Sequence, residues 1–152
     1  MREDVKDNRG FSFPKEERLH HRSLVEGLFR HGKSFYEFPF RVTWRILAEE
    51  ELNKNFRNKV PVGIGKMQVM VTIPKKKRKH AVDRVQMRRR TREAYRLNRI
   101  YLRSLIEINP HIKTLSISLI YIHDKNLPYL IVEDKMKTLL DKLITKIQGK
   151  DI

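Results

Sequence analysis

The sequence predicts an α/β sandwich, in which a small sheet carries helices packed on it. Two segments have the 3.6-residue period of amphipathic helices, and a third, strongly basic segment combines a cationic stripe with an apolar one. Between them, other segments alternate apolar and polar residues, which is the period of half-buried strands. A chain of 152 residues that is 39% hydrophobic has the size and composition of one domain with one core.

Composition suggests where this domain begins and ends. The polar residues 1–13 are expected to form a flexible arm, residues 14–148 a single domain and residues 149–152 a short tail. A first helix is expected over residues 14–32, because proline and acidic residues favour the first turn of a helix and glycine favours its end. Residues 48–66 lose periodicity and carry mixed charge, so we expect an exposed connection there.

Three segments are expected to supply strands of the sheet: residues 38–46, 67–73 and 115–123. In the first of them apolar residues occupy one parity, whereas Arg41 and Arg45 belong to the other. Successive side chains of a strand point to opposite faces. One face of the sheet is therefore predicted to be core, and the other polar and cationic.

The charge balance indicates a polyanionic partner. The chain has 34 Lys and Arg residues against 18 Asp and Glu residues, a formal net charge of +16, and such an excess repels itself unless a polyanion neutralises it. Nucleic acid is the expected partner, ahead of an anionic membrane surface. The absence of cysteine excludes disulfides and thiolate metal sites. With no signal-peptide core and no apolar run near the ~20 residues of a membrane span, we expect a cytoplasmic protein without a membrane partner.

The positive charge is concentrated in residues 75–103, which hold 13 basic residues and only two acidic ones. Here a lysine-rich stretch leads into a long helix that is expected to end before residues 109–113. Within this helix Arg84, Arg88 and Arg92 recur every four residues and so form one stripe. Arginine presents a planar fork that suits phosphate. A helix with an apolar stripe and an almost purely cationic polar face is typical of a polyanion-binding surface.

Two simpler explanations of the basic run stay open. The run could be a solvated charged face with no specific partner, or the pentamer KKKRK at residues 75–79 could be a nuclear localisation signal. We favour binding, because the cationic stripe is backed by an apolar stripe on one ordered helix and because basic pentamers are common in basic proteins.

The order of residues in this run resembles the signature of the bacterial ribonuclease P protein family. That signature has two lysines, Ala-Val, an Arg-Asn-Arg triplet, a basic pair and a later Arg-Glu. The matching positions are Lys76, Lys77, Ala81, Val82, Arg84, Arg88, Arg89, Arg92 and Glu93. The stretch RLHHRSLVEGLFRHG is also similar to the family's first helix, and the order of elements agrees over roughly residues 11–148.

The match has specific departures. Val85 and Gln86 stand where the family has the last two residues of its Arg-Asn-Arg triplet. Lys79 and His80 stand where the family usually has Gly and Asn before Ala-Val. The arginines at 88–90 are expected to supply the missing cation one turn further along the helix.

The resemblance implies a ribosomal protein S5 domain 2-like sandwich, with a small, mostly antiparallel sheet of about four strands, three helices and a left-handed βαβ crossover. It also implies a ribonucleoprotein in which a large RNA subunit removes the 5′ leader of precursor tRNA, while the protein supplies no catalytic residue. Ribonuclease P RNA and precursor tRNA are the expected partners, with no obligate protein partner. The residues expected to contact the RNA subunit are Lys76, Lys77, His80, Arg84, Gln86, Arg88, Arg89 and Arg92.

The resemblance further places the single-stranded leader in a cleft beside the first helix and the sheet. Single strands bind through backbone cations and stacking platforms. Phe29 matches an aromatic leader contact of the family, and Val25 stands where a second aromatic is often found. Arg41 and Arg45 are added because they lie on the polar parity of the first strand. The alternative for Phe29 is a plain core residue.

No catalytic motif is visible in the chain itself. His20 and His21 are neighbours, so in a helix they would point about 100° apart and would not converge on a metal. No P-loop, Rossmann glycines or nucleophile elbow occurs. We therefore expect no metal held by the protein, and Mg²⁺ held mainly by the RNA subunit and the substrate. The alternatives are a structural RNA-binding protein, such as a ribosomal protein, and a DNA-binding architectural protein.

Overall fold

A computed structural model of the chain describes residues 13–76 and 78–149. It confirms the α/β sandwich. The expected arm lies outside the described residues except for Phe13, and the expected tail except for Gly149. In chain order the elements are η2 (Lys15–Glu17), α2 (Arg22–His31), β1 (Lys33–Glu37), β2 (Phe40–Leu47), α3 (Glu49–Asn55), β3 (Met67–Thr72), α4 (Ala81–Asn98), α5 (Ile100–Glu107), β4 (Thr114–Tyr121) and α6 (Tyr129–Ile147).

The strands form one four-stranded sheet in the order β1-β2-β4-β3. β2 pairs antiparallel with both β1 and β4, whereas β3 pairs parallel with β4. The parallel pair is joined by a crossover through α4 and α5, which supplies the βαβ unit that the family resemblance implied. The prediction of a small, mostly antiparallel sheet of about four strands is therefore confirmed.

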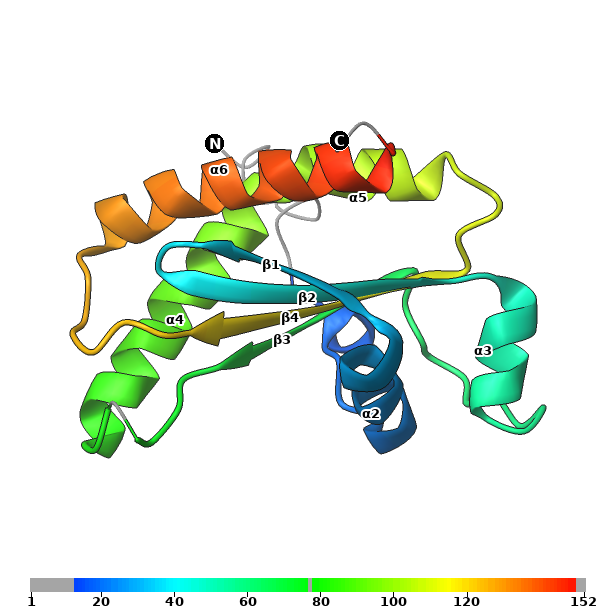
Figure 1. Cartoon of the computed structure of the whole chain (residues 1–152), viewed down its shortest axis with the longest axis horizontal. Coiled ribbons are helices and arrows are strands. Elements are labelled where there is room, and N and C mark those ends of the chain that lie inside the picture. The colour runs from blue at the N-terminus through cyan, green and yellow to red at the C-terminus, as the bar shows by residue number, and fades with distance from the viewer. Residues whose placement is uncertain (1–12, 77, 150–152) are drawn as a thin grey trace, which may run out of the picture.

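Helices cover both faces of this sheet. In Figure 1, α5 and α6 lie above the sheet and α2 projects below it, with α3 beyond one end. The main core lies between the sheet and the pair α4 and α6; among its buried residues are Phe40, Val42, Met67, Met87, Tyr95, Leu115, Ile117, Leu119, Met136 and Leu139. A smaller cluster on the other side consists of Leu19, Leu24, Leu28, Leu47 and Leu52.

The first helix begins at Arg22, which corrects the expectation that it begins at residue 14. The residues before it form η2 and an extended segment along β3, where the backbone N–H of Leu19 donates to the carbonyl of Val69 at 2.9 Å. Leu19 is buried, but in an extended conformation and not in the predicted helix. Pairing with the edge of β3 outweighs the helical spacing of the apolar residues.

The expected strand over residues 38–46 is the second half of a hairpin whose first half, β1, was not predicted. The turn between the two strands contains a cis peptide bond between Phe38 and Pro39. Phe38 therefore lies in the turn, and β2 starts at Phe40.

The described residues contain five α-helices, whereas three were expected. One additional helix, α3, lies in the connection of residues 48–66 and buries Leu52. The other arises because the long helix divides at Arg99 into α4 and α5. The side chain of Arg99 is fully buried and forms an ion pair with Glu17, so the chain changes direction around it.

Candidate nucleic-acid interface

Helix α4 has the two faces that its sequence predicts. Its buried residues are Met87, Thr91, Ala94 and Tyr95, and α4 packs on α6 and β3. The remaining surface carries most of the arginines of the basic run. How many of these arginines are available to a partner depends on their contacts within the protein.

Several of these arginines bind the protein itself. Nη1 of Arg84 donates to the backbone carbonyls of Arg78 and Lys79 at 2.7 and 2.8 Å, across the start of α4. Nη1 of Arg90 donates to the carbonyl of Leu127 at 2.7 Å, in the loop before α6. These arginines position α4 and the basic loop in front of it. Arg84 therefore has a structural contact in addition to its predicted role at the RNA subunit.

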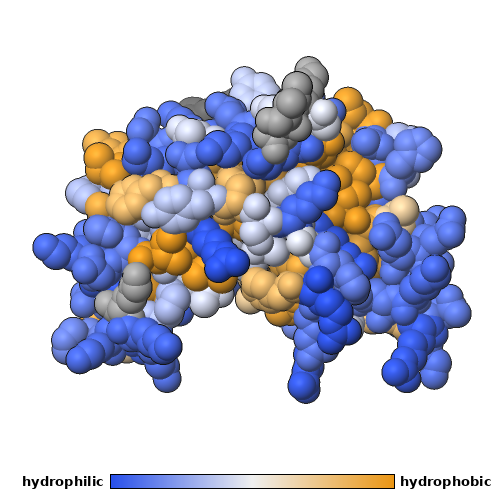
Figure 2. Space-filling view, viewed as in Figure 1, coloured by the Kyte–Doolittle hydropathy of each residue, from blue (hydrophilic) through white to orange (hydrophobic). Residues whose placement is uncertain are grey.

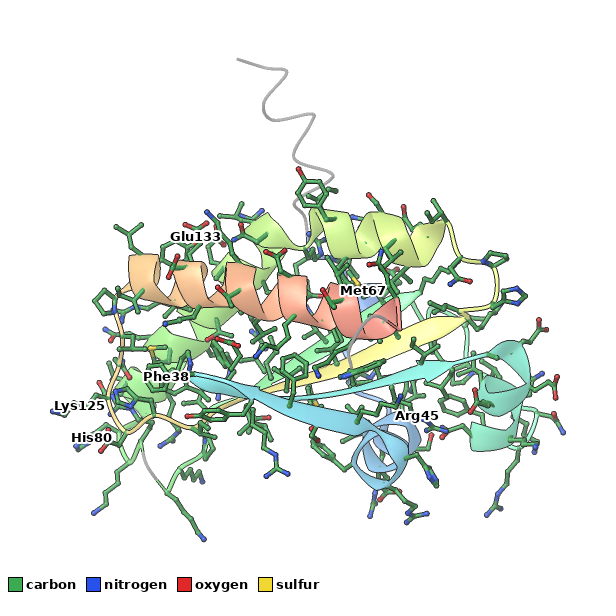
Figure 3. All side chains as sticks on the ribbon, turned by 45° about the horizontal axis from the view of Figure 1, so that its top comes forward. Phe38, Arg45, Met67, His80, Lys125 and Glu133 are labelled. Atoms are coloured by element: carbon green, nitrogen blue, oxygen red, sulfur yellow. The ribbon has the colours of Figure 1, made fainter. Side chains whose placement is uncertain are left out.

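The basic loop is also tied to the loop that follows β4. The guanidinium of Arg78 donates to the carbonyl of Asp124 and to Oδ1 of Asn126. Figure 3 places His80 and Lys125 at the same end of the molecule, near Phe38 of the hairpin turn. The ring of Phe38 lies 5.1 Å from that of His123. One end of the domain thus brings together the basic loop, the hairpin turn and the loop after β4.

Four of the basic residues predicted to contact the RNA subunit are not tied to carbonyl groups within the described residues, and we call them the α4 surface: Lys76, Arg88, Arg89 and Arg92. Lys76, Arg89 and Arg92 are exposed and Arg88 is half-buried. Of the other residues predicted to contact the RNA subunit, His80 is exposed, Gln86 is exposed and accepts a hydrogen bond from Asn126, and Lys77 lies outside the described residues.

Positive charges crowd at the edge of β3. Burial, and then the neighbouring charges of Arg18 and Arg88, lower the pKa of Arg92. Arg18 comes from the segment before α2 and also lies over the ring of Phe13. A hollow at this edge is lined by Lys15, Arg18, His20 and Arg92, among others. Repulsion between like charges is relieved when an anion binds, so this edge extends the α4 surface. Arg18 was not among the residues predicted to bind RNA, because residue 18 was assigned to the first helix.

Helix α2 has two flanks. Leu24 and Leu28 point into the smaller cluster. With 3.6 residues per turn, Val25 and Phe29 then lie on one flank, and Gly27 lies on the other. Phe29 is 49% exposed and belongs to neither core cluster, so the alternative of a core residue is wrong. Val25 is half-buried and packs on the smaller cluster.

Arg41 lies on an open part of the sheet. Its cross-strand neighbours are Tyr36 on β1 and Ile120 on β4, and Ile120 in turn lies beside Thr72 on β3. Arg41 and Tyr36 are exposed. This row offers a cation beside an aromatic ring and an aliphatic side chain, which is the combination that single-stranded nucleic acid prefers. We call Phe29 and this row the leader face.

Arg45 is not part of the leader face. It lies four residues further along β2, about 13 Å at the usual rise of a strand, and lines a cavity between α2 and α3 together with Gly27. Of the four residues predicted to bind the leader, Arg45 therefore lies on the Gly27 flank of α2, opposite Val25 and Phe29. In Figure 2, hydrophilic groups project from the surface over the start of α4, over α2 and over α3, and the surface is hollowed between these three places.

Within residues 13–76 and 78–149, none of the helices is long and apolar enough to cross a membrane. The same residues contain no group of three or more His, Cys, Asp or Glu side chains placed to hold a metal ion.

A basic α/β sandwich with exposed arginines on one long helix and a mixed cationic and aromatic sheet face is typical of nucleic-acid-binding proteins. Its sequence matches the family model for Ribonuclease P over residues 13–143. The chain belongs to the ribonuclease P protein family.

Three known proteins are similar to this chain. A ribonuclease P protein component of Porphyromonas gingivalis is 31% identical over 97 residues, which cover 64% of this chain and 62% of that protein. The RNase P protein from Thermotoga maritima superposes with a TM-score of 0.55 at 21% identity, over 83% of this chain and 96% of that one. The Staphylococcus aureus RNase P protein gives a TM-score of 0.54 at 18% identity, over 84% and 94%. At these identities the two structures show a shared fold.

Proposed function

We propose that this chain is the protein subunit of a ribonuclease P ribonucleoprotein. The observation that carries the proposal is the α4 surface: after the arginines bound within the protein are set aside, exposed cations still line one side of the helix whose sequence resembles the family signature. Arginine and lysine on a fixed helix bind RNA phosphates through charge-assisted hydrogen bonds and counterion release. The α4 surface would meet the RNA subunit.

The leader face would bind the 5′ leader of precursor tRNA. Phe29 supplies an exposed ring on α2, and Arg41 supplies an exposed cation on β2. Stacking on an aromatic ring is worth about 1–3 kcal/mol per base and tolerates any base. Such a surface suits a leader whose sequence differs from one precursor to the next.

The hydrolysis itself would be carried out by the RNA subunit. Mg²⁺ would be held mainly by that RNA and the substrate, and it would activate water and stabilise the leaving oxygen. The contribution of the protein is to bind and orient RNA. In this assignment none of its side chains acts as a catalyst.

Reconstitution tests the proposal. The purified protein is added to a bacterial ribonuclease P RNA, and cleavage of precursor tRNA is measured at low Mg²⁺. We expect faster cleavage than with RNA alone, and we expect Arg89→Gln combined with Arg92→Gln to weaken assembly. Lys137→Gln, at an exposed lysine of α6 outside the α4 surface, is the matched control. RNA binding without stimulation would favour a structural RNA-binding protein instead, and cleavage by the protein alone would contradict the assignment of the chemistry to RNA.

A further inference from the structure

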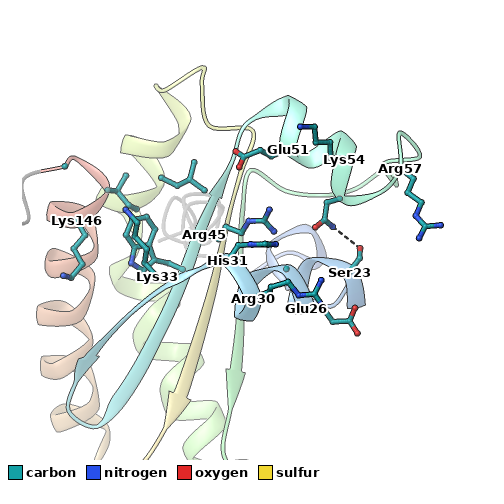
Figure 4. A pocket seen from close by; sticks show the side chains of 16 residues that line it. Ser23, Glu26, Arg30, His31, Lys33, Arg45, Glu51, Lys54, Arg57 and Lys146 are labelled. Carbon is teal, nitrogen blue, oxygen red and sulfur yellow. Dashed lines mark hydrogen bonds between the residues drawn. The ribbon is translucent and has the colours of Figure 1, made fainter.

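A large cavity lies on the flank of α2 that faces away from Phe29. It has a volume of about 980 Å³. Its walls come from α2, α3, the start of β1, the end of β2 and the end of α6. Figure 4 shows Arg45 and His31 near its centre, with Arg30 on α2 and Lys54 and Arg57 towards the side of α3. We call it the α2–α3 cavity.

Helix α3 is a fixed wall of this cavity. Nδ2 of Asn55 donates to Oγ of Ser23 at 3.1 Å and so joins α3 to α2 (Figure 4). Leu52 is buried in the smaller cluster beside Leu24 and Leu28. The cavity therefore depends on the connection of residues 48–66, which the sequence predicted to be an exposed connection.

The charge in the cavity is unbalanced. Its two acidic residues are engaged elsewhere: Glu26 pairs with Arg22 at 3.1 Å, and Glu51 accepts the backbone N–H of Ala48 at 3.1 Å. Arg30, Arg45, Lys54 and Arg57 have no carboxylate within ion-pair distance in the part of the chain that the structure describes.

One buried donor beside α2 has no acceptor. Nη1 of Arg45 is inaccessible to solvent and forms no hydrogen bond within the described residues. Arg45 can lie this close to α2 because residue 27 is glycine: a Cβ at Gly27 would be 2.4 Å from Nη1. A buried N–H without an acceptor is unfavourable, and more so when it belongs to a charged group. Arg45 therefore combines a positive charge with an unused donor beside the other cations of the cavity, and this combination suits the oxygens of a phosphate.

We propose that the α2–α3 cavity is a second RNA site, in which Arg45 receives a backbone phosphate. The guanidinium fork matches the geometry of a phosphate, and a cavity of this volume, with Lys54 and Arg57 along one wall, accommodates a nucleic-acid chain rather than one small ion. This site is separate from the leader face, because α2 stands between Arg45 and Phe29. The inference rests on the proposed function only for the identity of the RNA.

Binding of a short labelled single-stranded RNA to the full chain tests the proposal. We expect Arg45→Gln to lower the affinity about tenfold and to reduce the slope of log affinity against log salt by about 0.7, the value for one phosphate contact on a single strand. Lys54→Gln, at an exposed residue of the same wall, has a smaller effect in the same direction. Lys59→Gln changes an exposed lysine of the same connection outside the cavity and leaves both values unchanged.

Urea unfolding of each variant separates binding from folding. If Arg45→Gln and Lys54→Gln fold and keep the affinity and salt slope of the unchanged protein, the proposal is wrong. NMR of the Arg45 Nε–Hε group adds an independent readout. A shift with inorganic phosphate but none with RNA would reveal a small-anion site and would also overturn the proposal.

The source of the phosphate is found by repeating the measurement with the RNA subunit alone and with precursor tRNA carrying a long or a trimmed leader. The binding reaction that loses affinity in Arg45→Gln identifies the source, and either result supports the site. The proposed function is tested separately by cleavage with the unchanged protein. Loss of stimulation there, with an intact Arg45 effect, would refute the proposed function and leave the phosphate site standing.

Discussion

Arg99 and Glu17 form a bidentate ion pair inside the domain. Nε of Arg99 lies 2.7 Å from Oε1 of Glu17, and Nη2 lies 3.0 Å from Oε2. Arg99 is fully buried and Glu17 is 7% exposed. Because the partners are 82 residues apart, the pair fastens the segment before α2 to the junction between α4 and α5.

Glu17→Gln is expected to lower the free energy of unfolding by about 3 kcal/mol, because the guanidinium of Arg99 would stay buried without its counter-charge. Urea unfolding measures the change. Glu16→Gln, at the exposed neighbouring glutamate, is the control and should change stability by less than about 0.5 kcal/mol. Equal effects of the two substitutions would show that the ion pair does not stabilise the fold.

Arg89 and Arg90 are adjacent but are expected to respond differently to substitution. Arg89 is exposed, whereas Arg90 donates to the carbonyl of Leu127 at 2.7 Å. Arg89→Gln should weaken RNA binding and lower its salt dependence with little change in stability. Arg90→Gln should lower the free energy of unfolding by about 1–2 kcal/mol, since a hydrogen bond from a charged donor is lost.

Salt titrations of RNA affinity and urea unfolding of both variants test this pair. A large loss of stability in Arg89→Gln, or none in Arg90→Gln, would contradict the division of the basic helix into binding and positioning arginines.

Phe29→Ala is expected to weaken binding of leader RNA by about 1–3 kcal/mol through the loss of stacking, while the free energy of unfolding changes little because the ring is half exposed. Affinity for precursor tRNA with and without a leader measures the effect. Tyr101→Ala removes another exposed ring, on α5, and should leave the leader contribution intact. If both variants bind the leader like the unchanged protein, Phe29 is not a leader contact.

Stability is expected to fall as the pH rises above 10. Burial raises the pKa of Tyr121 from 10.0 to about 12, and burial, followed by the charge of Glu17, also raises the pKa of Tyr95. A tyrosine whose pKa is higher in the folded state stays protonated there while the unfolded chain ionises. The contribution of such a tyrosine to the free energy of unfolding is complete below pH 10, and it is lost as the pH rises through the pKa of the folded state.

Urea unfolding between pH 8 and 12 checks this prediction. Tyr95→Phe should flatten the decline, and at pH 7 it should cost nothing, because its buried hydroxyl has no hydrogen-bond partner within the described residues. Tyr121→Phe should cost about 1 kcal/mol at pH 7, since its hydroxyl donates to the carbonyl of Lys125. An unchanged pH profile in both variants would rule out these tyrosines as the cause.

The parts of the fold that the sequence predicted are those with a clear period. The positions of β2 and β4 and the two stripes of α4 depend on local spacing, and the structure confirms them. The prediction that one face of the sheet is polar and cationic is wrong for β4, where Ser116 and Ser118 are buried as well as the apolar residues. The start of α2, the strand β1 and the break at Arg99 depend on distant partners. Leu19 pairs with β3 and Arg99 with Glu17, and no local pattern reveals such a contact.

The candidate site was also predicted only in part. The sequence identified the basic helix, but it could not tell that Arg84 and Arg90 bind carbonyl groups of the protein. Parity placed Arg41 and Arg45 on one face of β2, yet only Arg45 lines the cavity beside Gly27 of α2, and Arg41 is exposed elsewhere on the sheet. Which residues share a site is decided by how α2 and α3 pack, and this information lies in Gly27, Asn55 and Leu52 rather than in the charges.

The extended segment before α2, which lies along the edge of β3, also limits pairing between two copies of the protein. An outer strand with free N–H and C=O groups invites pairing with a second copy, which leads to aggregation. Here the Leu19 N–H occupies the Val69 carbonyl, and the carbonyl of Glu16 accepts the N–H of Gly65 beside the start of β3. Part of that edge is therefore already paired within the protein, so a second copy has fewer free groups to which it could add a strand.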